Sequence, residues 1–109
     1  MNDNPNFGET IERLAKTIAA RKSAPTDTSY TASLLAGGVL KCAKKFSEEA
    51  TELVLAAATE TPERLASEAG DVIYHLLVLL AARNVEVAAV AATLKAREGR
   101  SGHAEKASR

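Results

Sequence analysis

Acidic side chains on two neighbouring segments are the residues of this 109-residue chain best placed to do chemistry. The first group reads E-E-x-x-E and comprises Glu48, Glu49 and Glu52; the second reads E-x-x-D and comprises Glu68 and Asp71. Positions three or four apart share one face of a helix. Glu49 and Glu52 are therefore expected to project together, and Glu68 and Asp71 to project together from a second helix.

A turn signal, Thr59-Glu60-Thr61-Pro62, separates the two acidic groups. Thr61 is a good N-cap, and Pro62 suits the first position of a helix. Two antiparallel helices joined by this turn would bring the acidic groups face to face, where their charges repel and a cation is needed to offset them.

Oxygen ligands without Cys suit a hard cation, Mg²⁺ first and Mn²⁺ second. We therefore predict a metal site formed by four carboxylates, Glu49, Glu52, Glu68 and Asp71. The competing interpretation is a solvated acidic face, which is the usual fate of Glu-rich helices. The second acidic pair, on the helix that must pack beside the first, favours the metal site.

The composition indicates one all-α domain spanning residues 1–109. Apolar residues make up 46% of the chain and aromatic residues only 4%, and an apolar content of mostly Ala, Leu and Val suits closely packed helices. Lys plus Arg equals Asp plus Glu, at 14 each, which argues against a nucleic-acid or membrane-surface binder. The single Cys42 and the lack of an apparent signal peptide favour the cytoplasm.

Periodicity and breakers predict four to five helices. The expected ranges are 8–22, 30–36, 39–58, 62 to about 83, and 87–98, with residues 1–7 and about 99–109 as flexible tails. Gly37-Gly38 should separate the second helix from the third. The apolar run 72–82 is too short to span a bilayer.

From Val72 onward the fourth helix is apolar nearly all round, so it should be buried on every side. A chain this short cannot surround such a helix by itself, and we predict that a homodimer completes the bundle. His75 within this helix is read first as a hydrogen-bonded core residue, although a substrate contact is open because Asp71 lies one turn away. Tyr74 is read as packing.

Basic side chains accompany the carboxylates. Lys41 and Lys45 precede Glu48 on one stripe, and Arg64 shares a stripe with Glu68. Helix-stabilising ion pairs explain such spacings, and a phosphate-binding surface is the functional alternative. Arg21, at the end of the first helix, could likewise stabilise its helix or bind phosphate. Tyr30-Thr31, before the glycine pair, could shape a pocket wall or form an ordinary helix joint.

Four stretches together are more specific than the carboxylates alone. They are S-Y-T-A at 29–32 with Leu34, K-F-S-E-E-A-T-E at 45–52, E-A-G-D-V-I-Y-H-L-L-V-L-L at 68–80, and Leu94 and Arg97 with the tail Ser101-Gly102 and Glu105-Lys106-Ala107. With them the chain resembles the phosphoribosyl-ATP pyrophosphohydrolase family, the second enzyme of histidine biosynthesis, within the wider all-α MazG-like superfamily. Ser47 and Gly70 stand where the family often has Gly and Ala, and neither departure removes a carboxylate.

The resemblance implies a cytoplasmic, typically dimeric, Mg²⁺-dependent hydrolase acting on a phosphoric anhydride. It would convert 1-(5-phosphoribosyl)-ATP to 1-(5-phosphoribosyl)-AMP and pyrophosphate. Glu48 would then be a general base or a further ligand, a role that it could exchange with Glu49. The expected substrate-binding residues are Arg21, Tyr30, Thr31, Lys41, Lys45, Arg64 and His75.

Three alternatives remain at this stage. A pyrophosphohydrolase that removes non-standard dNTPs would use the same metal cage. A di-iron carboxylate bundle would need E-x-x-H pairs, and here the second pair ends in Asp71. A helical interaction module would leave the acidic stripe merely solvated.

Overall fold

The computed structural model describes residues 4–100, 102 and 106, and its elements are helices, as predicted. In chain order they are α1 (Phe7–Ala20), the 3₁₀ turn η1 (Arg21–Ser23), α2 (Tyr30–Ala36), α3 (Val39–Thr59), α4 (Pro62–Ala82) and α5 (Val87–Ala96). Every predicted helix is present, and the predicted ends agree to within two residues. Residues 1–3, 101, 103–105 and 107–109, to which much of the two predicted tails belongs, lie outside the described part.

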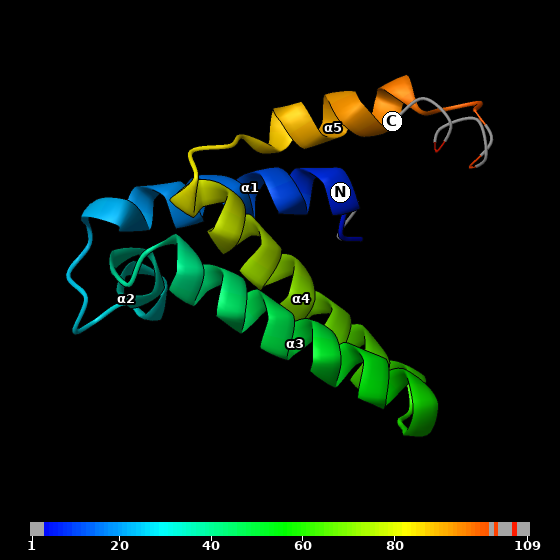
Figure 1. Cartoon of the computed structure of the whole chain (residues 1–109), viewed down its shortest axis with the longest axis horizontal. Coiled ribbons are helices and arrows are strands. Elements are labelled where there is room, and N and C mark those ends of the chain that lie inside the picture. The colour runs from blue at the N-terminus through cyan, green and yellow to red at the C-terminus, as the bar shows by residue number, and fades with distance from the viewer. Residues whose placement is uncertain (1–3, 101, 103–105, 107–109) are drawn as a thin grey trace.

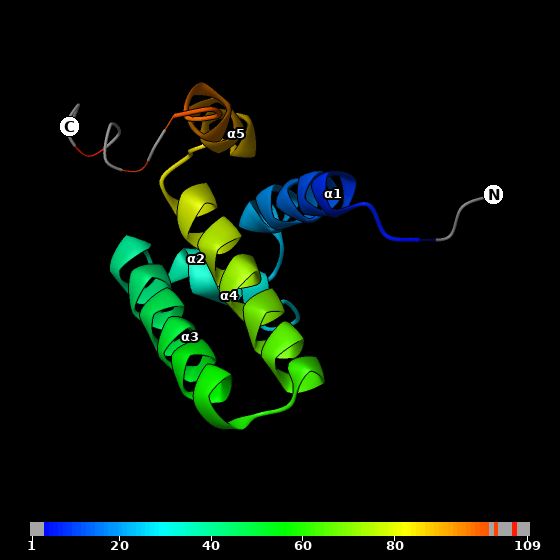
Figure 2. The same ribbon diagram turned by 90° about the vertical axis from the view of Figure 1, so that its right-hand side faces the viewer.

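The two longest helices, α3 and α4, form an antiparallel hairpin that dominates the molecule (Figures 1 and 2). The turn between them follows the predicted chemistry. The Thr61 hydroxyl accepts a hydrogen bond from the Arg64 amide at 3.2 Å, and Pro62 opens α4. This cap satisfies an amide that the first turn of a helix leaves without a partner.

The core lies at the end of the hairpin away from this turn, where α1 and α2 pack against it (Figure 2). Its fully buried side chains include Ile18 from α1, Leu34 from α2, Cys42 from α3 and Val78 from α4. The Cys42 thiol donates to the Leu34 carbonyl at 3.3 Å, and burial raises the pKa of this thiol. Cys42 is thus a small residue of the core.

The glycine pair reverses the chain between α2 and α3. Gly38 has φ of 92° and ψ of 173°, a region that only glycine occupies readily. Gly37 lies beneath the Lys41 side chain, because a Cβ at this position would come within 2.2 Å of Lys41 Cδ. The pair therefore both breaks the helix, as predicted, and lets Lys41 cross close to the backbone.

The start of α1 and the end of α4 also carry caps. Asn6 caps α1, its side-chain oxygen accepting from the Glu9 amide at 3.0 Å. The prediction of a flexible tail through residue 7 was therefore wrong at Phe7, which is the first helical residue. Asn84 follows the end of α4: it has φ of 58°, and the next amide, Val85 N, bonds back to the Leu80 carbonyl at 2.9 Å, a Schellman arrangement.

Helix α4 is long enough, and at a mean hydropathy of 1.5 apolar enough, to cross a bilayer by length and composition alone. In the structure it packs along α3 and carries Glu68 and Asp71 in its first half. These features are those of a central helix in a folded bundle.

Candidate metal centre

The hairpin brings carboxylates from both of its helices together. Glu49 of α3 and Glu68 and Asp71 of α4 each offer an oxygen within 4.8 Å of the others. Glu68 is buried, Glu49 is half-buried and Asp71 is exposed, so the cluster has a closed side and an open side. This acidic cluster can bind a metal ion.

Glu68 supplies the most informative atom of the cluster. Its Oε1 accepts from the Arg64 guanidinium at 3.1 Å, whereas its Oε2 is buried and has no hydrogen-bond partner among the described residues. A buried carboxylate oxygen left unpaired costs on the order of 1–3 kcal/mol or more. A bound cation would satisfy this oxygen.

The environment of Glu49 also disfavours the charged form of its carboxyl group. Burial is the main cause that raises the pKa of its carboxyl group; the negative charge of Glu52, hydrogen bonding with it and the charge of Asp71 add to the rise, and His75 opposes it. Glu52, the fourth predicted ligand, thus lies beside Glu49, but it is not one of the three carboxylates that converge.

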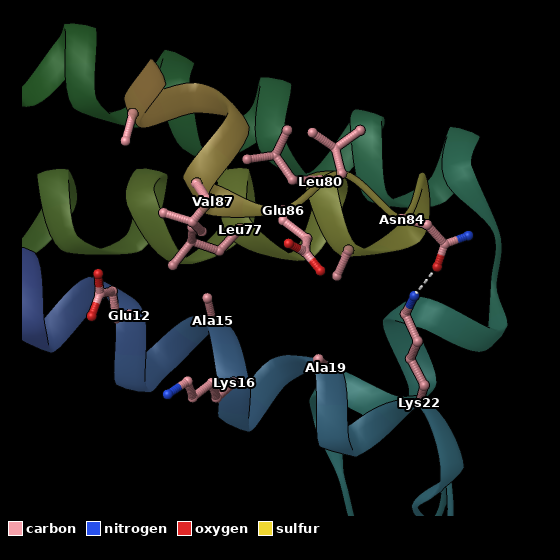
Figure 3. Close-up of a pocket in the computed structure, with 14 residues that line it drawn as sticks. Glu12, Ala15, Lys16, Ala19, Lys22, Leu77, Leu80, Asn84, Glu86 and Val87 are labelled. Atoms are coloured by element: carbon pink, nitrogen blue, oxygen red, sulfur yellow. Dashed lines mark hydrogen bonds between the residues drawn. The ribbon is translucent and has the colours of Figure 1, made fainter. Parts of the chain in front are cut away.

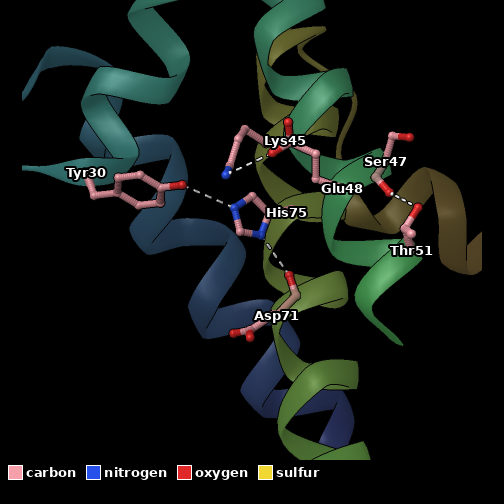
Figure 4. Close-up of polar contacts among 7 residues, drawn as sticks. All are labelled: Tyr30, Lys45, Ser47, Glu48, Thr51, Asp71 and His75. Atoms are coloured by element: carbon pink, nitrogen blue, oxygen red, sulfur yellow. Dashed lines mark hydrogen bonds and ion pairs between the residues drawn. The ribbon is translucent and has the colours of Figure 1, made fainter. Parts of the chain in front are cut away.

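Glu48 turns toward a lysine of its own helix. Its carboxylate pairs with Lys45 at 3.1 Å, and both side chains are partly exposed (Figure 4). The hydrogen bond to Glu48, with a contribution from nearby Tyr30, raises the pKa of the Lys45 amine and favours its charged form. Glu48 is therefore paired with Lys45 and partly accessible to solvent.

Buried His75 connects α2 to α4, the helix that carries Glu68 and Asp71 (Figure 4). Its Nδ1 lies 2.9 Å from the Asp71 carbonyl oxygen, which can only accept, so Nδ1 carries the proton. In the neutral ring Nε2 is then the acceptor for the Tyr30 hydroxyl at 3.5 Å. Both nitrogens have partners, as expected of a core histidine, and the predicted substrate contact of His75 stays a prediction.

A second contact between the same helices was missed from the sequence. The Thr31 hydroxyl hydrogen-bonds the Tyr74 hydroxyl, so Tyr74, read only as packing, also fastens α2 to α4. A tyrosine in an otherwise apolar helix is a signal for such a bond, because its hydroxyl needs a partner when buried.

The remaining predicted cations are dispersed. Arg64 is tied to Glu68. Arg21 is exposed in η1, and Lys41 is exposed on α3 above Gly37. Within residues 4–100, 102 and 106, no ion pair joins Arg21 or Lys41 to the clustered carboxylates.

A groove lies elsewhere on the described part of the molecule. It has a volume of about 590 Å³ and lies between α1, the end of α4 and α5, with an apolar floor that includes Leu77, Leu80 and Val87 (Figure 3). Leu80 is nine residues beyond Asp71, roughly 14 Å along the helix axis. The groove and the carboxylates are therefore separate features.

Comparison with known proteins agrees with these features. The family model of phosphoribosyl-ATP pyrophosphohydrolase matches residues 11–98. The chain is 61% identical over 99 residues to a phosphoribosyl-ATP pyrophosphatase of Cereibacter sphaeroides, covering 91% of this chain and 96% of that protein. It is 58% identical over 99 residues to one of Dinoroseobacter shibae, covering 91% and 97%.

The chain belongs to the phosphoribosyl-ATP pyrophosphohydrolase family. This confirms the resemblance inferred from the sequence. All three clustered carboxylates of this family member lie within the matched region.

The raised pKa of Glu49 leads to a prediction for the metal-free protein. The folded state holds the Glu49 proton to higher pH than the unfolded chain does, so ionisation of Glu49 destabilises the fold as pH rises. Glu49→Gln should therefore melt at a higher temperature than the wild type at pH 7 in chelator. The difference should shrink as the pH falls below the ordinary glutamate pKa, when both carry a neutral side chain.

Thermal melts followed by circular dichroism across pH 3–8 (the ordinary glutamate pKa being about 4.3) measure this difference. Glu12→Gln, on an exposed position of α1, controls for the loss of one negative charge. A lower melting temperature for Glu49→Gln at pH 7 would contradict the destabilisation that burial and neighbouring negative charge impose on the ionised Glu49 carboxylate.

Proposed function

We propose that the protein hydrolyses 1-(5-phosphoribosyl)-ATP to 1-(5-phosphoribosyl)-AMP and pyrophosphate, the second step of histidine biosynthesis, with Mg²⁺ as its cation. Membership of the family supports the reaction. The observation that carries the metal dependence is the convergence of three carboxylates, one of which, Glu68, has a buried oxygen without a hydrogen-bond partner among the described residues.

The donor set fits a hard divalent cation. Glu49, Glu68 and Asp71 would hold it, with Glu52 beside Glu49 as a fourth ligand. Carboxylate oxygens alone favour Mg²⁺, and they also accept Mn²⁺. When bound, such a cation polarises the phosphate oxygens and stabilises the charge that develops on departing pyrophosphate.

Glu48 is the residue that we assign as general base. Its carboxylate is near the cluster in sequence, yet it pairs with Lys45 and remains partly exposed, so it can reach a water molecule. Glu49 is the exchange candidate because its raised pKa favours proton acceptance. Glu49 cannot hold a cation and a proton on the same oxygen, which leaves the base role to Glu48 when Glu49 is a ligand.

Lys45 is the cation best placed for the substrate phosphates. It is close to Tyr30, and its pKa favours the charged form. The Tyr30 hydroxyl, itself hydrogen-bonded to His75, lies at the same edge of the site (Figure 4). The further substrate-binding candidates are Arg21, Thr31, Lys41, Arg64 and His75.

The reaction is tested by pyrophosphate release from 1-(5-phosphoribosyl)-ATP, with Mg²⁺ or chelator, beside a panel of dNTPs. We expect release from phosphoribosyl-ATP that chelator abolishes and Mg²⁺ or Mn²⁺ restores. Asp71→Asn and Glu68→Gln should lower the rate by about 100-fold or more, because each removes a proposed ligand. Glu12→Gln, far from the cluster in sequence, is the matched control.

Release from dNTPs alone would keep the metal centre but assign the protein to nucleotide-pool cleaning. Full activity of Asp71→Asn would contradict the proposed ligands. Inactivity of folded wild-type protein on every substrate would favour a helical interaction module.

We place this reaction in the cytoplasm, away from membranes and nucleic acids. The balanced charge of 14 basic and 14 acidic residues gives no attraction for either polyanion. The relatives are named phosphoribosyl-ATP pyrophosphatases, and an enzyme that acts on a small nucleotide fits the same placement.

We also propose that the protein forms a dimer with another copy of its own chain. Leu40, Val54 and Leu55 of α3 are 86%, 68% and 63% exposed, and they follow one face of the helix. Exposed apolar side chains gathered on one face mark an interaction surface. α4 adds to the argument, because its second half is apolar nearly all round yet only half-buried at Leu76, Leu79 and Leu80.

Light scattering coupled to size-exclusion chromatography tests the dimer. The wild type should elute at about twice the 11.5 kDa chain mass. Val54→Glu should shift the protein toward the monomer without lowering its helicity, because Val54 is exposed within one chain. A wild type that is monomeric at micromolar concentration would contradict the dimer.

A further inference from the structure

Arg64 is poorly placed to stabilise its own helix. It lies in the first turn of α4, three residues after the Thr61 cap. The positive end of the helix dipole lies there, so a cation is unfavourable. The pair that Arg64 makes with Glu68 also has the basic residue N-terminal, which is the weaker orientation for an ion pair at this spacing.

The contact is nevertheless made, and it is made to a buried partner. The Arg64 side chain is 60% exposed, whereas that of Glu68 is only 12% exposed. The guanidinium therefore reaches from solvent to a carboxylate inside the hairpin. Charge-assisted bonds to buried carboxylates are stronger and more orienting than those on the surface.

The hydrogen bond from Arg64 gives the two carboxylate oxygens of Glu68 different surroundings. Oε1 is taken by Arg64, and Oε2 is buried with no hydrogen-bond partner among the residues that the structure describes. One oxygen of this carboxylate lies within 4.8 Å of oxygens of Glu49 and Asp71. With Oε1 fixed, the carboxylate cannot turn freely about its last bond. This is how a neighbouring hydrogen bond orients a metal ligand.

We propose that Arg64 is a positioning residue, which binds Oε1 of Glu68 so that Oε2 is presented to the cation held with Glu49 and Asp71. The inference rests on the proposed metal centre. It is an alternative to the direct phosphate contact that the sequence suggested for Arg64, and the two roles differ in what they do to cation affinity.

Calorimetric titration of the full-length protein with Mn²⁺, without substrate, measures that affinity. Arg64→Met should bind Mn²⁺ about 10-fold more weakly than the wild type, the lower end of the usual loss when a bond that orients a ligand is removed. Arg64→Lys keeps a hydrogen-bond donor and should be intermediate. Arg13→Met, which removes an exposed guanidinium of α1 bonded to Thr10, should match the wild type.

Three results would overturn the inference. Equal or tighter Mn²⁺ binding by Arg64→Met would mean that the guanidinium only repels the cation. Unchanged Mn²⁺ affinity with a raised KM would assign Arg64 to the phosphates. A wild type that binds no Mn²⁺ would remove the metal centre itself. Circular dichroism melts show whether each variant is folded.

Discussion

Repulsion among Glu49, Glu68 and Asp71, held within 4.8 Å of one another, is the constraint to which the rest of the site responds. The apolar surfaces of α3 and α4 enforce it, because packing these helices brings the carboxylates together whether or not their charges are neutralised. Burial, and after it the charges of Glu52 and Asp71, raise the pKa of Glu49, and one buried oxygen of Glu68 has no hydrogen-bond partner among the described residues. A divalent cation would favour the ionised form of Glu49 and give the buried Glu68 oxygen a partner.

Helix α2 fixes the other side of the site. Its first two residues bond to consecutive residues of α4, Tyr30 to His75 and Thr31 to Tyr74. His75 in turn donates to the Asp71 carbonyl, so the position of α2 is coupled to the backbone that carries a cluster residue. Stability at the core end and geometry at the carboxylates therefore depend on the same contacts.

Local rules predicted much of this arrangement. Thr61-Pro62 predicted the start of α4, Gly37-Gly38 the break before α3, and i,i+3 spacing the acidic groups. The partners of individual side chains were harder to predict from the sequence, because they depend on how each helix rotates about its axis when it packs. That rotation places Glu52 beside the three-carboxylate set and turns Glu48 to Lys45. The Asn6 cap and the Tyr74 hydroxyl bond were missed although both have a local signal, a side-chain acceptor before a helix and a phenol in an apolar helix.

The central claim is that a divalent cation binds where α3 meets α4. Anomalous diffraction from crystals grown with Mn²⁺ tests it most directly, since the metal is located without reference to activity. The account predicts an anomalous peak within about 2.5 Å of oxygens from Glu49, Glu68 and Asp71. A strong peak elsewhere, or none at this site at saturating Mn²⁺, would contradict it.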